Sequence, residues 1–151
     1  MPAIKDILAN KGSQVLSVSK SATVMDAALL MNEHKIGALV VVENKQVIGI
    51  FTERDVLQRV VAVTRDPAKT RISDVMTTEV ACARPETKID EARSVFKNRR
   101  IRHLPVIDDN KQLVGLISIG DLNAYEINGQ ETTIHFLHEY LYGTTDTGHT
   151  A

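Results

Sequence analysis

The sequence predicts a mixed α/β fold, of the α+β type, made of two copies of one βαββα unit related by an approximate twofold axis. Residues 24–56 return as residues 89–122, with an offset of 65 residues at Val24 and Ile89 and of 66 at Gly49 and Gly115. A short lead-in segment, I-K-D-I-L at 4–8 and I-S-D-V-M at 72–76, precedes each copy. Tandem copies of one supersecondary unit bury their apolar faces against each other, so two near-equivalent clefts should follow.

In the first copy, we expect strands over residues 15–18, 38–42 and 47–51. Thr23 and Asp26 have the spacing of a capping box, and the apolar residues Ala27, Leu30 and Met31 recur at helical spacing, so a helix should follow and end near residue 37. Two β-branched runs separated by a polar turn predict a hairpin over 38–51. A second helix should run from residue 53 to about 61.

The second copy repeats this order, with strands over 80–83, 104–107 and 113–118 and helices over 90–98 and from 119 to about 125. A polar, proline-containing linker over 63–71 joins the copies. We therefore expect one module over residues 1–129, with repeat 1 over about 1–66 and repeat 2 over about 67–129. An amphipathic helix over 130–142 and a flexible polar tail over 143–151 should follow.

Composition narrows the class of protein. The chain is 43% hydrophobic and 25% charged with a formal net charge of −1, which gives no overall attraction to nucleic acid or to an anionic membrane. No apolar run approaches the roughly 20 residues of a membrane span, and the first residues lack the apolar core of a signal peptide, so we expect a cytoplasmic protein. The single cysteine, Cys82, excludes an internal disulfide and should be a small core residue.

Each copy also shares a motif where its second hairpin strand meets its last helix. The copies read G-I-F-T-E-R-D at 49–55 and G-L-I-S-I-G-D at 115–121. A helix N-terminus offers free N–H groups and partial positive charge to a phosphate, and an aspartate there can accept two hydrogen bonds from a ribose diol. The same Thr/Ser-x-x-Asp spacing also forms a capping box that needs no ligand. Both interpretations stay open on the motif alone.

The two βαββα units resemble the cystathionine β-synthase (CBS) domain family. The resemblance lies in the first hairpin strand, which reads I-G-A-L-V-V-V in one copy and I-R-H-L-P-V-I-D in the other, and in the corner motif G-h-h-S/T-x-x-D, where h is apolar. The pair is similar to a Bateman module over about residues 4–125, and to stand-alone bacterial CBS-domain signalling proteins. The resemblance implies a regulatory module that binds AMP, ADP, ATP, S-adenosylmethionine or NAD between the repeats without catalysis.

The resemblance also implies roles for single residues. Asp55 and Asp121 would bind ribose, with Thr52 and Ser118 as neighbouring hydroxyls. The phosphate-binding pair would be Arg102 and His103, whose equivalents in repeat 1 are the uncharged Gly37 and Ala38, while Arg54 would supply part of the missing charge there. A weaker set for adenine comprises Val18, Ser19, Lys20, Ala22, Ala83, Arg84, Thr87, Ile36, Gly37, Ala38 and Ile101. Unequal side chains predict unequal affinities for the two clefts.

Other sequence patterns give weaker evidence about function. The basic stretch at 97–103 has no interleaved aromatic residues, so we expect an anion pocket and no nucleic-acid surface. His135 and His138 lie one helical turn apart but lack a third ligand at fixed spacing, so no metal site is assigned. No catalytic constellation meets the repeat clefts, so we expect no enzyme. The alternative to a nucleotide sensor is a partner-binding adaptor with non-functional clefts. Either should be a homodimer and act on a regulated protein that the sequence does not identify.

Overall fold

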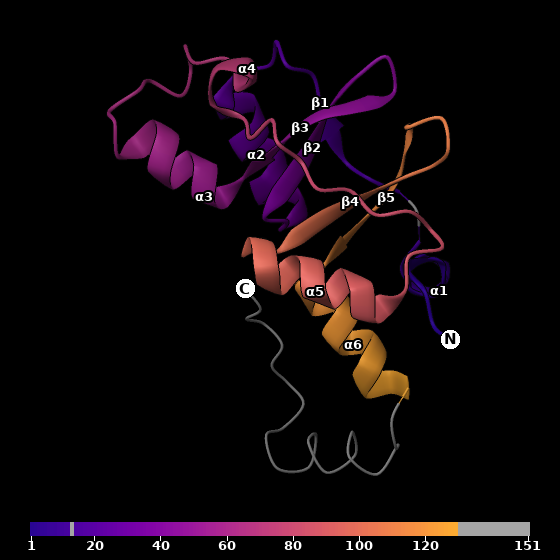
Figure 1. Cartoon of the computed structure of the whole chain (residues 1–151). Coiled ribbons are helices and arrows are strands. Elements are labelled where there is room, and N and C mark those ends of the chain that lie inside the picture. The colour runs from indigo at the N-terminus through magenta and orange to yellow at the C-terminus, as the bar shows by residue number, and fades with distance from the viewer. Residues whose placement is uncertain (13, 130–151) are drawn as a thin grey trace, which may run out of the picture.

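The two sequence copies fold as two α/β halves in the computed structural model, which describes residues 1–12 and 14–129 (Figure 1). The first half contains β1 (Ser17–Val18), α2 (Val24–His34), β2 (Ala38–Glu43), β3 (Gln46–Thr52), α3 (Glu53–Asp55) and η1 (Val56–Val61). The second contains α5 (Ile89–Arg99), β4 (His103–Ile107), β5 (Leu113–Ser118) and α6 (Ile119–Gly129). The lead-in segments form α1 (Ile4–Lys11) and α4 (Ile72–Val75). The predicted α+β architecture is confirmed.

Each half is built around an antiparallel hairpin. In the first half, β1 pairs in parallel with β2, which pairs with β3; in the second, β4 pairs with β5. The two hairpin turns meet at a bridge between Gln46 and Gln112, and the Leu113 N–H donates to the Lys45 carbonyl (3.2 Å). The hairpins therefore lie side by side, as Figure 1 shows.

The first strand of each copy is shorter than expected. Instead of residues 15–18 only Ser17–Val18 is extended, and residues 80–83 make a single parallel bridge, Ala83 to Val106. At this bridge, Ala83 N donates to Pro105 O (2.8 Å) and Ile107 N donates to Ala83 O (2.8 Å). To extend this parallel ladder, the N–H groups of residue 105 on one side and of residue 85 on the other would have to donate. Both residues are prolines, and proline has no N–H. Two prolines thus limit this strand to one residue.

Two other expectations are corrected. The helix predicted from residue 53 is α-helical only over α3 and π-helical over η1, where Ala62 N donates to Leu57 O (2.9 Å). Cys82 is exposed, because its buried neighbour Ala83 takes the inward-facing position. The predicted C-terminal helix and tail, with His135 and His138, lie outside the described residues. Among the described helices, none has the length and apolar character that crossing a membrane requires.

The core is divided in two, and the lead-in helices cross between the halves. Ile4 and Ile7 of α1 are buried with residues of the second half, including Phe96 and Leu104. Ile72 and Val75 of α4 are buried with residues of the first half. Each lead-in helix therefore completes the core of the other copy, and fully burying one isoleucine contributes about 1.5–3 kcal/mol.

Candidate functional site

The crossing helices bring a new residue to each Thr/Ser-x-x-Asp corner. At the first corner, Asp55 Oδ2 accepts from Thr52 N (3.0 Å) and Thr52 Oγ1 (3.2 Å). Thr77, just beyond α4, donates its hydroxyl to Asp55 Oδ1 (3.2 Å), and Arg59 Nε lies 3.5 Å from the same oxygen. Asp55 is only 6% exposed. Both of its carboxylate oxygens are therefore occupied by groups of the protein itself.

The second corner is more open. Asp121 Oδ2 accepts from Ser118 N (2.8 Å) and from Lys11 Nζ of α1 (2.6 Å), and among the described residues no donor is bonded to Oδ1. The side chains of Lys11 and Asp121 are 37% and 26% exposed. A ligand could reach this carboxylate without breaking a buried core.

Both corners have the geometry of capping boxes. Asp55 N donates to Thr52 Oγ1 (3.3 Å) and Asp121 N donates to Ser118 Oγ (3.1 Å), each the reciprocal of the bond to the aspartate. The capping interpretation of the motif is thus confirmed for both copies. Ribose binding by the aspartates stays a prediction, and the structure favours Asp121 for it because its Oδ1 is available.

The glycine that opens each motif has a packing role. A Cβ on Gly49 would lie 2.7 Å from Met76 Sδ, and one on Gly115 would lie 2.8 Å from Leu8 Cδ2. Met76 and Leu8 hold the same position in the two lead-in segments. Because each glycine lacks a Cβ, the lead-in segment of the other copy can pack closely on the strand that leads into the corner.

The predicted phosphate pair lies beside the second corner. His103 is directly opposite Ser118 in the β4–β5 ladder, and the Arg102 carbonyl accepts from Ile119 N (3.0 Å). Burial lowers the pKa of His103 below its usual value, and the positive charges of Lys11 and Arg102 lower it further, while Asp121 acts in the opposite direction. Lys11, His103, Ser118 and Asp121 are therefore brought together at this corner, the place of the predicted second cleft, and Arg102 directly precedes His103 there.

The first cleft differs at each of these positions. The Gly37 carbonyl accepts from Glu53 N (3.0 Å), the same bond that Arg102 makes with Ile119, so Gly37 is the structural counterpart of Arg102. A side chain on Gly37 would collide with the Glu53 carboxylate. Ala38 is buried, and Arg54 is exposed on α3. The first corner therefore has the Glu53 carboxylate beside the glycine that replaces Arg102, and the predicted inequality of the two affinities stays a prediction.

Two segments of the adenine set, residues 18–22 and 83–87, lie at the opposite ends of the lead-in helices from the aspartates, whereas Gly37 and Ala38 lie at the first corner. Ile72 N donates to Ala22 O (2.8 Å) and Ser73 N to Lys20 O (3.0 Å), and Ile4 N donates to Thr87 O (2.9 Å). Asp55 and Asp121 instead meet residues at or just past the C-terminal ends of these helices.

Several adenine-set residues have partners within the protein. Lys20 pairs with Glu43 (2.8 Å) and Arg84 with Asp109 (2.7 Å), and Ile36 and Ile101 pack against the two cores. Val18 and Ala22 pack against the core of the first half as well. Their role in adenine binding stays a prediction.

Sequence reasoning missed Lys11 and Thr77 as members of the two corners. The signal that could have found them is the recurrence of the lead-in segments, because equivalent helices must meet equivalent surfaces. The identity of those surfaces depends on the crossing of α1 and α4.

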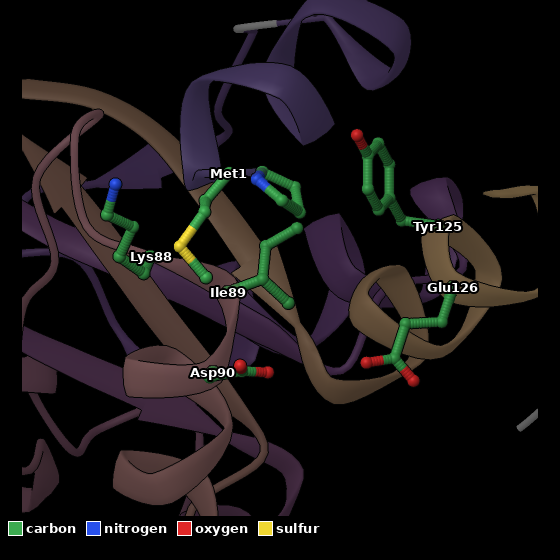
Figure 2. Close-up of a pocket in the computed structure, with 7 residues that line it drawn as sticks. Met1, Lys88, Ile89, Asp90, Tyr125 and Glu126 are labelled. Carbon is green, nitrogen blue, oxygen red and sulfur yellow. The ribbon is translucent and has the colours of Figure 1, made fainter.

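A separate hollow lies at the base of the second half. This pocket, of about 320 Å³, is lined by Met1, Pro2, Lys88, Ile89, Asp90, Tyr125 and Glu126. Figure 2 shows Tyr125 and Glu126 of α6 across from Met1 and Ile89. None of the predicted site residues lines it. Within residues 1–12 and 14–129, no three His, Cys, Asp or Glu side chains gather where they could hold a metal ion.

The paired βαββα halves with crossed lead-in helices and a polar corner in each define a tandem-repeat module whose two corners have different charged groups. The chain belongs to the CBS domain family, whose model matches residues 4–62 and 72–127. Both matches fall on the repeats described above.

Relatives and solved structures agree with this assignment to the CBS domain family. The CBS domain-containing protein YhcV of Bacillus subtilis is 35% identical over 130 residues, covering 86% of this chain and 89% of that protein. The structure of a putative signal-transduction protein with CBS domains from Burkholderia ambifaria is 40% identical with a TM-score of 0.81, covering 87% of this chain and 98% of that one. The CBS domain pair of protein MJ0100, solved with 5′-methylthioadenosine and S-adenosyl-L-methionine, shares the fold at 23% identity, a TM-score of 0.76, and 86% and 99% coverage.

Proposed function

We propose that this chain is a regulatory module that binds an adenine nucleotide, AMP, ADP, ATP or NAD, in the cleft of its second repeat. The observation that carries the proposal is the convergence of Arg102, His103, Ser118 and Asp121 on one strand-to-helix corner. The adenosine-containing ligands of the MJ0100 domain pair support the choice of an adenine compound.

The chemistry of the cleft suits a nucleotide. Asp121 can accept hydrogen bonds from the two ribose hydroxyls, and bonds to a charged group are about twice as strong as neutral ones. Arg102 offers planar paired donors to phosphate, and His103 adds a donor whose charge depends on pH. The N-terminus of α6 contributes its partial positive charge. These groups bind and orient a ligand, and we assign no reaction to the module.

A second function, that of a partner-binding adaptor, is favoured for the first cleft. Asp55 is buried and engaged by Thr52, Thr77 and Arg59, and the Glu53 carboxylate would repel a phosphate. On this account the first repeat stabilises the module and presents a surface while the second binds the nucleotide. One nucleotide per chain would support this division, and two would contradict it.

We further propose that the module is a homodimer whose arrangement transmits ligand binding to a regulated protein. Met25 and Leu29 of α2 and Leu57 and Val61 of η1 are exposed, each pair one helical turn apart. Three of their counterparts in the second half, Asp90, Ser94 and Asn123, are polar, and the fourth is Ile127, which is exposed. Exposed apolar stripes of this kind mark surfaces for association, so copies should meet through their first halves.

Thermal unfolding with a panel of ligands tests nucleotide binding. At 100 times its dissociation constant, a ligand should add about 2.7 kcal/mol of stability. We expect AMP, ADP, ATP or NAD to raise the melting temperature of the wild-type chain, with GMP as the control for the base. Failure of every adenine compound to stabilise the protein would leave the adaptor function.

A further inference from the structure

The second cleft contains one further cation, Lys11, to which the proposed nucleotide binding assigns no part. Lys11, the last residue of α1, donates from Nζ to Asp121 Oδ2 and to the Leu116 carbonyl, both at 2.6 Å. It reaches this corner across 110 residues of sequence because α1 packs on the second half. Its ammonium group therefore rests on the carboxylate assigned to ribose.

Lys11 is also close to the phosphate-binding groups. The charges of Lys11 and Arg102 both act on His103, which pairs with Ser118 at the same corner. Lys11 and Arg102 thus bring two positive charges near the single negative charge of Asp121, and a protonated His103 adds a third. A phosphate of two negative charges would complement this cluster, whereas Asp121 alone does not.

The pair between Lys11 and Asp121 is suited to exchange. Both side chains are partly exposed, so water screens their attraction and the pair contributes little stability. Lysine carries a compact charge on a flexible four-carbon stem, which lets the ammonium move while α1 stays fixed by Ile4 and Ile7. The ammonium can therefore leave Asp121 without unfolding the helix.

We propose that Lys11 is a movable phosphate-binding residue of the second cleft, paired with Asp121 when the cleft is empty and with the ligand's phosphate when it is filled. The exchange frees Asp121 for the ribose hydroxyls, so the phosphate and the ribose bind in a coupled way. The ligand class is an adenosine 5′-phosphate, and the inference rests on the proposed nucleotide binding. Lys11 then makes the cleft select phosphorylated adenosine over adenosine itself.

The first cleft has no equivalent residue. When the lead-in segments are aligned at Ile4 and Ile72, the position of Lys11 falls on Glu79. The lead-in segment therefore brings to Asp55 only the neutral hydroxyl of Thr77, and the one cation on Asp55 among the described residues is Arg59, one turn along the same helical segment. The selection for phosphate is therefore a property of the second cleft alone.

Calorimetric titration of AMP and adenosine into the wild type and Lys11→Gln tests this assignment. The glutamine removes the charge and can still donate to the Leu116 carbonyl. We expect AMP affinity to fall about tenfold or more, the cost of one charge-assisted contact, while adenosine affinity stays the same or rises because Asp121 loses its competitor. Lys5→Gln, an exposed position on the same helix, should change neither affinity. Lys11→Arg should keep most of the AMP affinity.

Two other results would have separate meanings. Unchanged AMP affinity in Lys11→Gln, or equal losses for AMP and adenosine, would overturn the role of Lys11 and leave the proposed function standing. A wild-type chain that binds neither compound would overturn the proposed function itself. Should Lys11→Gln fail to fold by circular dichroism, Lys11→Arg decides, because its loss of the preference for AMP over adenosine would contradict the assignment.

Discussion

At the scale of single residues, the two aspartates of the shared motif have different surroundings. Asp55 is buried and holds three partners, whereas Asp121 is partly exposed and is held by its cap and by Lys11. The same sequence position therefore contributes mainly to stability in one repeat and is available for a ligand in the other.

Substitution of each aspartate should separate these roles. We expect Asp121→Ala to weaken AMP binding by about 10- to 150-fold, through loss of charge-assisted hydrogen bonds of about 1.5–3 kcal/mol. Asp55→Ala should instead lower the free energy of unfolding by about 1–3 kcal/mol, because it leaves the Thr77 hydroxyl and Arg59 without their partner. Calorimetry and urea denaturation measure the two effects. Unchanged AMP affinity in the double variant would leave capping as the sole role of the motif.

His103 should make AMP binding depend on pH. Burial and the charges of Lys11 and Arg102 lower its pKa, and only Asp121, among the groups acting on it, opposes them. A bound phosphate favours the protonated form, so AMP affinity should rise as pH falls toward the lowered pKa of His103 in the ligand-free protein. Phosphate itself gains a proton near pH 6, so His103→Gln is the matched control at each pH. A pH profile shared by wild type and His103→Gln would contradict this role.

The titration of His103 should also affect the free energy of unfolding. A histidine whose pKa is lower in the folded than in the unfolded state binds fewer protons when folded, so its contribution to stability is present above about pH 6.5 and is lost as pH falls below it. Urea denaturation of the ligand-free chain should show a smaller loss on acidification in His103→Gln than in the wild type. Equal losses would show that His103 does not contribute.

At the scale of the elements, the docking of α1 on β5 depends on a glycine. Gly115 leaves room for Leu8, whose Cδ1 and Cδ2 atoms lie 3.0 and 2.8 Å from a built Cβ. The fit positions Lys11 one turn further along the helix. The contact therefore links the packing of α1 to the geometry of the second corner.

We expect Gly115→Ala to destabilise the fold by about 1–3 kcal/mol, since the added methyl group overpacks this contact. Leu8→Ala should relieve the collision, so the double variant should be less destabilised than the sum of the single changes. Thermal unfolding of the four proteins in this cycle gives the coupling. Strict additivity would show that Leu8 and Gly115 do not share the contact.

At the scale of the whole molecule, the crossed lead-in helices tie the two halves together, and among the described residues more large apolar side chains are exposed on the helices of the first half than on those of the second. Leu57 and Val61 are each 61% exposed and Leu29 is 60% exposed. The position of Leu57 in the second half is Asn123, which accepts from Arg93 (3.4 Å). The two faces therefore differ in polarity although they derive from one repeat.

We expect Leu57→Asp to convert the proposed dimer to a monomer, because a twofold interface would bring two carboxylates into an apolar contact. Asn123→Asp, at the equivalent position of the second half, is the control and should leave the assembly unchanged. Light scattering after size exclusion measures the mass, and small-angle scattering with saturating AMP tests whether the dimer changes shape. A monomeric wild-type chain would contradict the proposed homodimer. A dimer whose shape does not change with AMP would contradict the proposal that its arrangement transmits ligand binding.

Much of the fold, and part of the candidate site, could be predicted from the sequence alone. The repeat, the hairpins and the capping boxes follow from local periodicity and from side chains within four residues of each other. The contrast between Arg102 with His103 and Gly37 with Ala38 was also visible, since equivalent positions of two copies can be compared without a structure. What these patterns define is local conformation and the chemistry at each position.

The tertiary structure decided which copy each lead-in helix completes, and with it the partners of the two aspartates. The apolar spacing of Ile4 and Ile7 shows that one face of α1 is buried, but it is the same spacing as in α4 and does not identify the covering surface. Lys11 meets Asp121 only because that surface belongs to the second half. Hydrophobic burial is non-directional, so sequence predicts that a face is covered, while the choice of partner depends on how the whole chain packs.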